Sequence, residues 1–177
     1  VSTCPIKVIF TGDNSLRKRP MDRVVLPLKE FGATFSTNFG NKLPINVAGN
    51  QESIPIRYEL LVPSAQVKSA ILLAGLNVRG RTTVVEREAS RDHTEKLFKH
   101  LKLKIKIKHK HKYQIIHIEG GKQYDALNYN IPGDISSASF FIVLTLLSKN
   151  SKLIIKNINV NKSRTGIIDI LKKMNAK

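Results

Sequence analysis

The sequence predicts an α+β fold built from repeated αβ units. Short apolar strands alternate along its 177 residues with helical segments that follow polar turns. Two stretches repeat one theme of Gly-Asp, serine and an apolar helix: TGDNSL at 11–16 and PGDISSAS at 132–139. PSAQVKSA at 63–70 is a looser third copy. Such repetition favours a repeat fold over a doubly wound nucleotide-binding fold, and neither the dinucleotide fingerprint nor the P-loop motif occurs.

The first third of the chain is expected to contain one helix among short strands. Residues 6–11 are expected to form a strand that ends at Gly12-Asp13. A helix from about Pro20 to Phe31 presents an apolar face and stops at Gly32, and Pro27 inside it requires a kink or a compensating neighbour. Further short strands are expected at the following ranges: 34–37, 43–47 and 57–62.

Four helices are expected in the rest of the chain, with strands between them. Each helix follows a polar turn. Ser64 is a favourable N-cap for a helix that runs through AQVKSAILLAGL towards Gly80, and Ser90 for a helix over 91–101 with acidic residues in its first turn. An apolar helix is expected after Gly133-Asp134, and a last helix from about 164 to 174. Strands are expected at 82–87 and 152–159.

Charge and composition restrict the partners of this chain. It has 30 lysine and arginine residues against 13 acidic ones, a net charge of +17 and a pI of about 10.2. Anionic partners are therefore favoured: nucleic acid, acidic membrane surface, or phosphorylated and carboxylated metabolites. The single cysteine, Cys4, excludes an intrachain disulfide and fits a reducing compartment. The apolar run at 140–147 is too short to cross a bilayer.

The segment LKLKIKIKHKHKYQIIHI at 101–118 places lysines at alternate positions. Strict alternation with leucine and isoleucine predicts a strand with one buried and one solvated face, broken at 109–112 and followed by a returning strand at 113–118. A solvated hairpin face is the favoured interpretation, because nucleic-acid binding usually adds aromatic platforms and only Tyr113 lies nearby. His109 and His111 have no third ligand, so no metal site is expected.

The candidate binding residues lie at three helix starts, where free N–H groups and the helix dipole favour anions. Arg19 precedes Pro20, Ser64 opens a turn with Ala65 and Gln66, and Arg91 follows Ser90. A guanidinium beside such groups can hold a phosphate or carboxylate through two hydrogen bonds. The structural alternatives are a solvated basic cluster for Arg19, a simple cap for Ser64, and an ion pair with Glu95 for Arg91.

Three long blocks resemble the 5-enolpyruvylshikimate-3-phosphate synthase family, also called 3-phosphoshikimate 1-carboxyvinyltransferases. They are TGDNSLRKRPMDRVVLPLKEFGA (11–33), VPSAQVKSAILLAGLNVRGRTTVVEREASRDHTEK (62–96) and the stretch from PGDISSAS to KKM (132–174). SAQVKSA and SRDHTEK are most similar to the bacterial branch that includes naturally glyphosate-tolerant members. The resemblance implies transfer of the enolpyruvyl group of phosphoenolpyruvate to the 5-hydroxyl of shikimate 3-phosphate, with release of phosphate, on the route to chorismate and aromatic amino acids. It implies no metal and no organic cofactor.

The family fold has two lobes of three βαβαββ-type repeats, and its members are much longer than this chain. Residues 1–130 are therefore expected to be most of one lobe, and residues 131–177 the crossover and the first unit of the second lobe. The chain is expected to be an incomplete portion that lacks turnover alone, because the family's proton-transfer groups lie outside the matched part. No catalytic residue is assigned within it.

The resemblance also implies roles for particular residues. Arg19 and Gln66 match positions for phosphoenolpyruvate, while Ser64, Ala65, Gln66 and Arg91 match positions for shikimate 3-phosphate. A hinge is expected at the crossover between lobes, at the following residues: Gly133, Asp134, Ser136 and Ser137.

The expected partners are the two small anionic substrates, with no specific nucleic acid and no membrane, in a cytoplasmic protein that is monomeric at full length. Two alternatives stay open: a basic nucleic-acid-binding module using the lysine hairpin, and the sibling transferase that acts on a UDP-sugar. No counterpart of that sibling's reactive-cysteine loop is found here, and the SRDHTE block argues against it.

Overall fold

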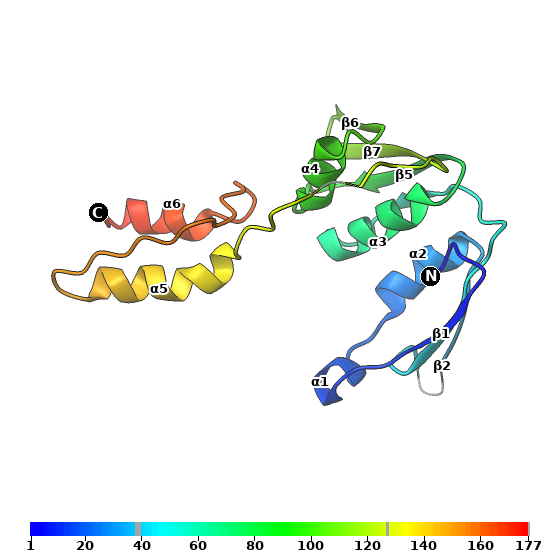
Figure 1. Ribbon diagram of the computed structural model, residues 1–177, viewed down its shortest axis with the longest axis horizontal. Helices are drawn as coiled ribbons and strands as arrows, with labels where there is room; N and C mark the ends of the chain where they lie inside the picture. Colours follow the sequence, from blue (N-terminus) through cyan, green and yellow to red (C-terminus); the bar gives the residue numbers. More distant parts are fainter. Residues whose placement is uncertain (38–39, 127, 177) are drawn as a thin grey trace. The chain divides into compact units, whose positions relative to one another are not determined.

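The computed structural model describes residues 1–37, 40–126 and 128–176. The chain divides into two units, residues 1–125 and 126–177, which we describe separately (Figure 1). The boundary expected from the sequence, between 130 and 131, stays a prediction.

The first unit begins with an antiparallel sheet in the order β1-β3-β2. In β3, Ile45 and Val47 are buried while Asn46 is exposed, which is the alternation of a sheet with one covered face. Val25 of the neighbouring helix packs against these two residues. The elements of this part are β1 (Lys7–Phe10), α1 (Asn14–Arg17), α2 (Asp22–Glu30), β2 (Thr34–Thr37) and β3 (Ile45–Ala48).

The rest of the first unit has the chain order βαβαββ, which the resemblance implied. Its strands form one sheet in the order β4-β5-β7-β6, in which β4 and β5 are parallel and the other pairs antiparallel. The elements are β4 (Arg57–Glu59), α3 (Ala65–Leu76), β5 (Gly80–Glu86), α4 (His93–His100), β6 (Ile105–Lys110) and β7 (Tyr113–Gly120).

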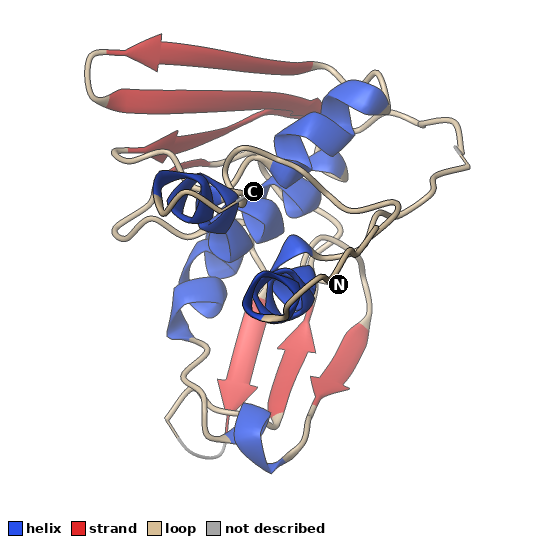
Figure 2. Ribbon diagram, turned by 90° about the vertical axis from the view of Figure 1, so that its left-hand side faces the viewer, coloured by secondary structure: helices blue, strands red, loops and turns tan. Residues whose placement is uncertain are grey.

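Helix α3 is the centre of the first unit. It packs on β5 and β7 and contacts α2, so both helices lie between the two sheets (Figure 2). Ile71 and Leu72 are fully buried, as expected of a helix that is apolar on nearly every side. The helix and β7 approach so closely that a Cβ at Gly120 would lie 1.9 Å from the carbonyl oxygen of Gly75. The position of α3 on the sheet is therefore tightly defined.

The lysine hairpin has the predicted alternation. Leu103 is buried, Ile105 and Ile107 pack against the core, and the intervening lysines are exposed. The register pairs Lys110 with Tyr113, so β6 continues beyond the expected break and the turn consists of residues 111–112. His111 has a φ of 52°, which places it in the left-handed region common in tight turns.

Two expected helix starts in the first unit are wrong, and one short helix is missing from the prediction. Helix α2 begins at Asp22, with Met21 rather than Pro20 before it, because the Met21 N–H donates to the carbonyl of Asn41. Helix α1 was not expected; Asp13 caps its single turn. Helix α4 has Asp92 at its N-cap position instead of Ser90. Pro27 lies within α2 and is buried, and the helix continues past it.

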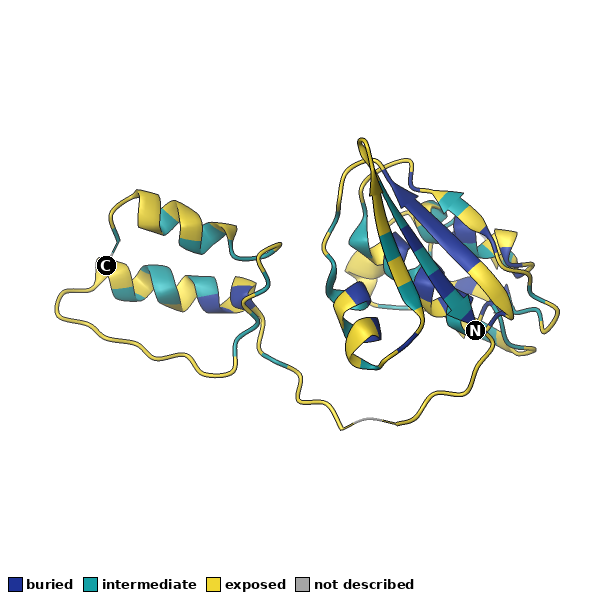
Figure 3. Ribbon diagram, turned by 90° about the horizontal axis from the view of Figure 1, so that it is seen from above, coloured by how far each residue is buried: buried dark blue, intermediate teal, exposed yellow. Residues whose placement is uncertain are grey.

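The second unit contains α5 (Ile135–Leu147) and α6 (Gly166–Lys173). The strand expected at 152–159 is wrong: in the described part of this unit, pairing is limited to one parallel bridge between Gly133 and Ile158. A strand needs a neighbour to satisfy its backbone groups, and a single bridge does not extend it. Exposed and half-buried residues dominate both helices (Figure 3).

Candidate functional site

The opening turn of α3 is built as the sequence predicts. Ser64 is the N-cap, in an extended conformation, and its Oγ accepts a hydrogen bond of 3.4 Å from the N–H of Val67. The N–H groups of Ala65 and Gln66 belong to the first turn and have no acceptor within the helix. This end of a 12-residue helix therefore offers free donors and a positive dipole end to an anion.

An open hollow with a volume of about 470 Å³ lies beside this turn. Helix α3 contributes Ala65, Gln66 and Ser69 to its lining, while Arg91 comes from the segment before α4 and Thr94 from the first turn of α4. The Oγ of Ser69 lies 2.6 Å from Oγ1 of Thr94, so the two walls are joined by a hydrogen bond. Because the lining contains an exposed guanidinium and hydroxyls but no carboxylate, it suits a phosphorylated or carboxylated ligand with hydroxyl groups.

The structure thus brings together two of the three helix starts. Gln66 and Arg91 line the same hollow, with Ser64 as the adjacent cap. The alternative role for Arg91, an ion pair with Glu95, is wrong, because Glu95 Oε1 lies 2.6 Å from Nζ of Lys68 instead. In the described chain, Arg91 forms no ion pair with an acidic side chain.

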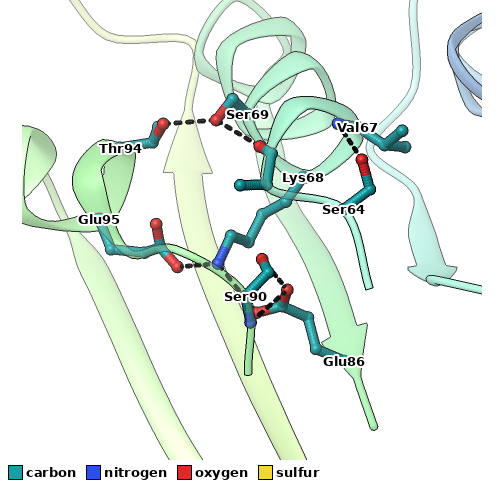
Figure 4. A network of polar contacts seen from close by, with 9 residues as sticks. Ser64, Val67, Lys68, Ser69, Glu86, Ser90, Thr94 and Glu95 are labelled. Atoms are coloured by element: carbon teal, nitrogen blue, oxygen red, sulfur yellow. Dashed lines mark hydrogen bonds and ion pairs between the residues drawn. The ribbon is translucent and has the colours of Figure 1, made fainter. Parts of the chain in front are cut away.

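A buried ionic network lies behind this hollow (Figure 4). Lys68, one turn into α3, reaches Glu86 at the end of β5 with an Nζ–Oε2 distance of 2.9 Å. Glu95, in the first turn of α4, is its second partner. All three side chains are at most 1% exposed. The other oxygen of Glu86, Oε1, accepts hydrogen bonds from the N–H of Ser90, at 3.3 Å, and from its hydroxyl.

The contact between Lys68 and Glu95 is an ion pair by distance, although its direction is not that of a hydrogen bond. Neither oxygen of Glu95 has a hydrogen-bond partner among the residues that the structure describes. Its position in the first turn of α4 compensates part of this cost, because the positive end of a helix dipole stabilises a carboxylate.

Arg19 lies in the connection between α1 and α2, and its N–H donates to the carbonyl of Leu16. It does not line the hollow with Gln66 and Arg91. Since α2 begins only at Asp22, Arg19 does not directly precede a helix start as the sequence suggested. The structure leaves its predicted role untested.

The predicted hinge residues form a local capping arrangement in the second unit. Asp134 is the N-cap of α5, and its Oδ1 accepts from the N–H of Ser136 at 3.1 Å. Arg164 donates to this oxygen at 3.3 Å and to the hydroxyl of Ser136. The Ser136 N–H, followed by the guanidinium, lowers the pKa of Asp134 below its ordinary value of 3.8. The proposed hinge motion at Gly133–Ser137 stays a prediction.

The outer face of the second sheet carries the charge of the hairpin. Lys106, His117 and Thr83 are neighbours in one row across β6, β7 and β5. Burial, followed by repulsion from Arg81, Lys108 and Arg57, lowers the pKa of His117 below 6.5, and Nδ1 of the ring is 2.9 Å from Oγ1 of Thr83. Lys106 and Lys108 lie on β6, the strand at the edge of this sheet, where charged side chains commonly prevent pairing with other strands. The face therefore fits the solvated interpretation.

Within residues 1–37, 40–126 and 128–176, no group of three or more potential ligands is arranged to hold a metal ion. No helix there has the length and apolar character needed to cross a membrane.

Comparison with known proteins decides the family. The model of the family described as EPSP synthase (3-phosphoshikimate 1-carboxyvinyltransferase) matches residues 1–177. The chain belongs to the EPSP synthase family. It is 46% identical over 179 residues to the 3-phosphoshikimate 1-carboxyvinyltransferase of Caldicellulosiruptor bescii, covering 99% of this chain and 41% of that protein. The corresponding protein of Zymomonas mobilis is 44% identical over 174 residues, with 98% of this chain and 38% of that protein covered.

A solved EPSP synthase structure from Acinetobacter baumannii has the same fold, with a TM-score of 0.81 and 38% sequence identity. That comparison covers 98% of this chain and 38% of the solved chain. The predicted architecture, an incomplete EPSP synthase-like α+β fold, is confirmed. The chain spans about two fifths of the length of the curated relatives it matches.

Sequence reasoning missed the buried network behind the hollow. The available signal was Lys68 itself, a lysine in the otherwise apolar helix AQVKSAILLAGL. A charge at such a position requires buried partners. Its carboxylate partners are 18 and 27 residues away in sequence, so local patterns do not identify them.

Proposed function

We propose that this chain supplies part of the shikimate 3-phosphate site of a 3-phosphoshikimate 1-carboxyvinyltransferase. The observation that carries this proposal is that Gln66 and Arg91 line one hollow at the open start of α3. Free helix N–H groups and a guanidinium are the donors that a phosphate or carboxylate prefers. Family membership across the whole chain supports the choice of ligand.

The complete reaction joins the 5-hydroxyl of shikimate 3-phosphate to the enolpyruvyl carbon of phosphoenolpyruvate and releases inorganic phosphate. In this account the residues of the chain act by binding and orientation. Arg91 neutralises the phosphate of shikimate 3-phosphate, and Ser64, Ala65 and Gln66 hold the same substrate at the helix start. Gln66 is close to both substrates, so it also orients phosphoenolpyruvate, together with Arg19. Holding two anions together lowers the entropic and electrostatic cost of the transition state.

Calorimetric titration of the 177-residue chain with shikimate 3-phosphate tests the binding proposal. The Arg91→Ala variant is expected to bind about 10-fold to 100-fold more weakly, the effect of losing hydrogen bonds between charged groups. Arg87→Ala is the matched control, because Arg87 is an exposed arginine of the same segment that pairs with Glu59. Equal affinities of the two variants, or preferential binding of a UDP-sugar, would refute the proposal.

Turnover is a separate test. The chain spans about two fifths of its relatives, and we expect it to release no phosphate from the two substrates at an enzymic rate. A chimera in which residues 1–177 replace the matching segment of the Caldicellulosiruptor bescii protein is expected to be active. In that chimera, Arg19→Ala should weaken use of phosphoenolpyruvate more than binding of shikimate 3-phosphate. Normal turnover by the 177 residues alone would contradict this account.

The finer parts of the proposal rest on the family resemblance. We assign the chain to the branch that includes glyphosate-tolerant members, and we expect the complete protein to be a cytoplasmic monomer that binds no specific nucleic acid. Residues 1–130 would contribute most of one lobe and residues 131–177 the start of the other, with Gly133–Ser137 at the hinge. Inhibition of the active chimera by glyphosate at concentrations that inhibit sensitive enzymes would contradict the branch assignment.

A further inference from the structure

The buried network connects the two walls of the hollow. Lys68 lies on α3 three residues after Ala65, and its partners Glu86 and Glu95 lie on either side of the segment that carries Arg91. Ser90, the residue directly before Arg91, donates its N–H and its hydroxyl to Glu86. The segment from the end of β5 to the first turn of α4 is therefore joined to α3 at both ends, through Glu86 and Glu95, and Ser90 ties it back to Glu86 (Figure 4).

The network is costly as a source of stability. Desolvation of buried ions commonly offsets their attraction, and apolar residues of similar size are often equally stabilising or better. Here two carboxylates share one ammonium, and the oxygens of Glu95 have no hydrogen-bond partner in the described part of the chain. Unlike apolar packing, such a network fixes the relative positions of its side chains, because the ammonium group of Lys68 must lie between both carboxylates.

Electrostatics alone also does not account for the network. An excess carboxylate behind an anion site would repel the ligand and weaken its binding. A purely electrostatic role therefore predicts that removing the three charges strengthens anion binding. A positioning role predicts the opposite result, which makes the two separable by the sign of the change.

We propose that Lys68, Glu86 and Glu95, together with Ser90, are positioning residues that hold Arg91 opposite Gln66 across the hollow. This inference rests on the proposed function, since it concerns the same site. The network does not contact the ligand. It fixes the distance between the helix start and the guanidinium, so that both reach one anion at once and little entropy is lost on binding.

The first test replaces the network by apolar side chains of similar shape, in the triple variant Lys68→Met/Glu86→Met/Glu95→Met. The affinity of the 177-residue chain for shikimate 3-phosphate is measured from amide shifts in NMR titrations, and the dispersion of the spectrum shows whether the variant is folded. We expect binding about tenfold weaker than in the wild type. Unchanged or tighter binding by a folded triple variant overturns the positioning role.

A second comparison separates positioning from general destabilisation. Adding Arg91→Ala should weaken binding by the wild type but change binding by the folded triple variant less than twofold or so, because the guanidinium there no longer reaches the ligand. A destabilised but correctly arranged site would retain the full effect of Arg91 in its folded fraction. An equal effect of Arg91→Ala in both backgrounds overturns the inference.

A milder variant decides the question if the triple variant does not fold. Ser90→Ala removes only the hydroxyl bond to Glu86 and should weaken binding about threefold or more. Ser53→Ala is the matched control, since it deletes a hydroxyl bonded to the carbonyl of Asn50 in a turn outside the network. Equal affinities of these two variants overturn the inference. Absence of binding by the wild-type chain would contradict the proposed function itself.

Discussion

Replacing Lys68 with methionine tests the energetics of the buried network. The change keeps an unbranched side chain, one atom shorter, but leaves Glu86 and Glu95 buried without a cation, where Nζ lay 2.9 and 2.6 Å from their oxygens. Removing one partner of a buried ion pair costs about 3–5 kcal/mol. Domains have total stabilities of about 5–15 kcal/mol, so the variant is expected to lose a large share of its stability.

Hydrogen exchange in α3 is the appropriate assay, because it reports on the first unit alone. The amides of Ile71 and Leu72, both fully buried, exchange by unfolding of this core. A loss of 3 kcal/mol makes their exchange about a hundredfold faster at the same pH. The triple methionine variant is the control: it removes the uncompensated carboxylates as well and is expected to exchange within about tenfold of the wild type.

An acceleration of exchange of less than about fivefold in Lys68→Met, which corresponds to roughly 1 kcal/mol, would contradict this expectation. Such a result would mean that water or a rearranged side chain reaches the two carboxylates. Equal destabilisation of the triple and the single variant would also contradict the expectation, since the loss would then come from packing rather than from uncompensated charge.

Core packing, a histidine on the sheet and the lysine hairpin give three further expected outcomes. Phe98→Ala should destabilise the first unit by about 3–5 kcal/mol in urea unfolding, while Leu61→Ala, at 86% exposed, should change it by less than about 0.5 kcal/mol. The pKa of His117 is lowered below 6.5 in the folded chain, so as pH falls its imidazole ring is protonated in the unfolded chain before it is protonated in the folded chain. The free energy of unfolding should therefore decrease as pH drops from about 8 to about 5.5. His117→Gln should lessen that fall, and an identical pH profile would contradict it. The wild-type chain should bind DNA oligomers without sequence preference and lose this binding at about 0.2 M salt, and the Lys104→Ala/Lys106→Ala variant should behave in the same way. DNA binding that persists at this salt concentration would favour a nucleic-acid function.

Local patterns predicted the elements that hydrophobic periodicity or a capping residue determines. The alternation around Ile105 and Ile107 identified the buried face of the hairpin, and Ser64 identified the start of α3. Free donors at a helix start, together with the family resemblance, predicted Gln66 and Arg91 as binding residues. Both line the same hollow, and their binding roles stay predictions.

What the sequence did not predict depends on distant partners. Ser90 has the pattern of an N-cap, but its hydroxyl is used by Glu86, whose position is determined by Lys68. Glu95 was a plausible partner for Arg91 at helical spacing, and the buried ammonium takes that role. The strand at 152–159 has suitable residues but only a single bridge to a neighbour. In each case, a contact across many residues overrode the local preference.

A crystal structure of the chain with shikimate 3-phosphate bound is the most direct test of the central claim. The account predicts the ligand in the hollow beside α3, with a phosphate oxygen within hydrogen-bond distance of the Arg91 guanidinium and the ring close to Gln66. A ligand bound at the lysine face of β6, or in the hollow without any contact to Arg91, would contradict it.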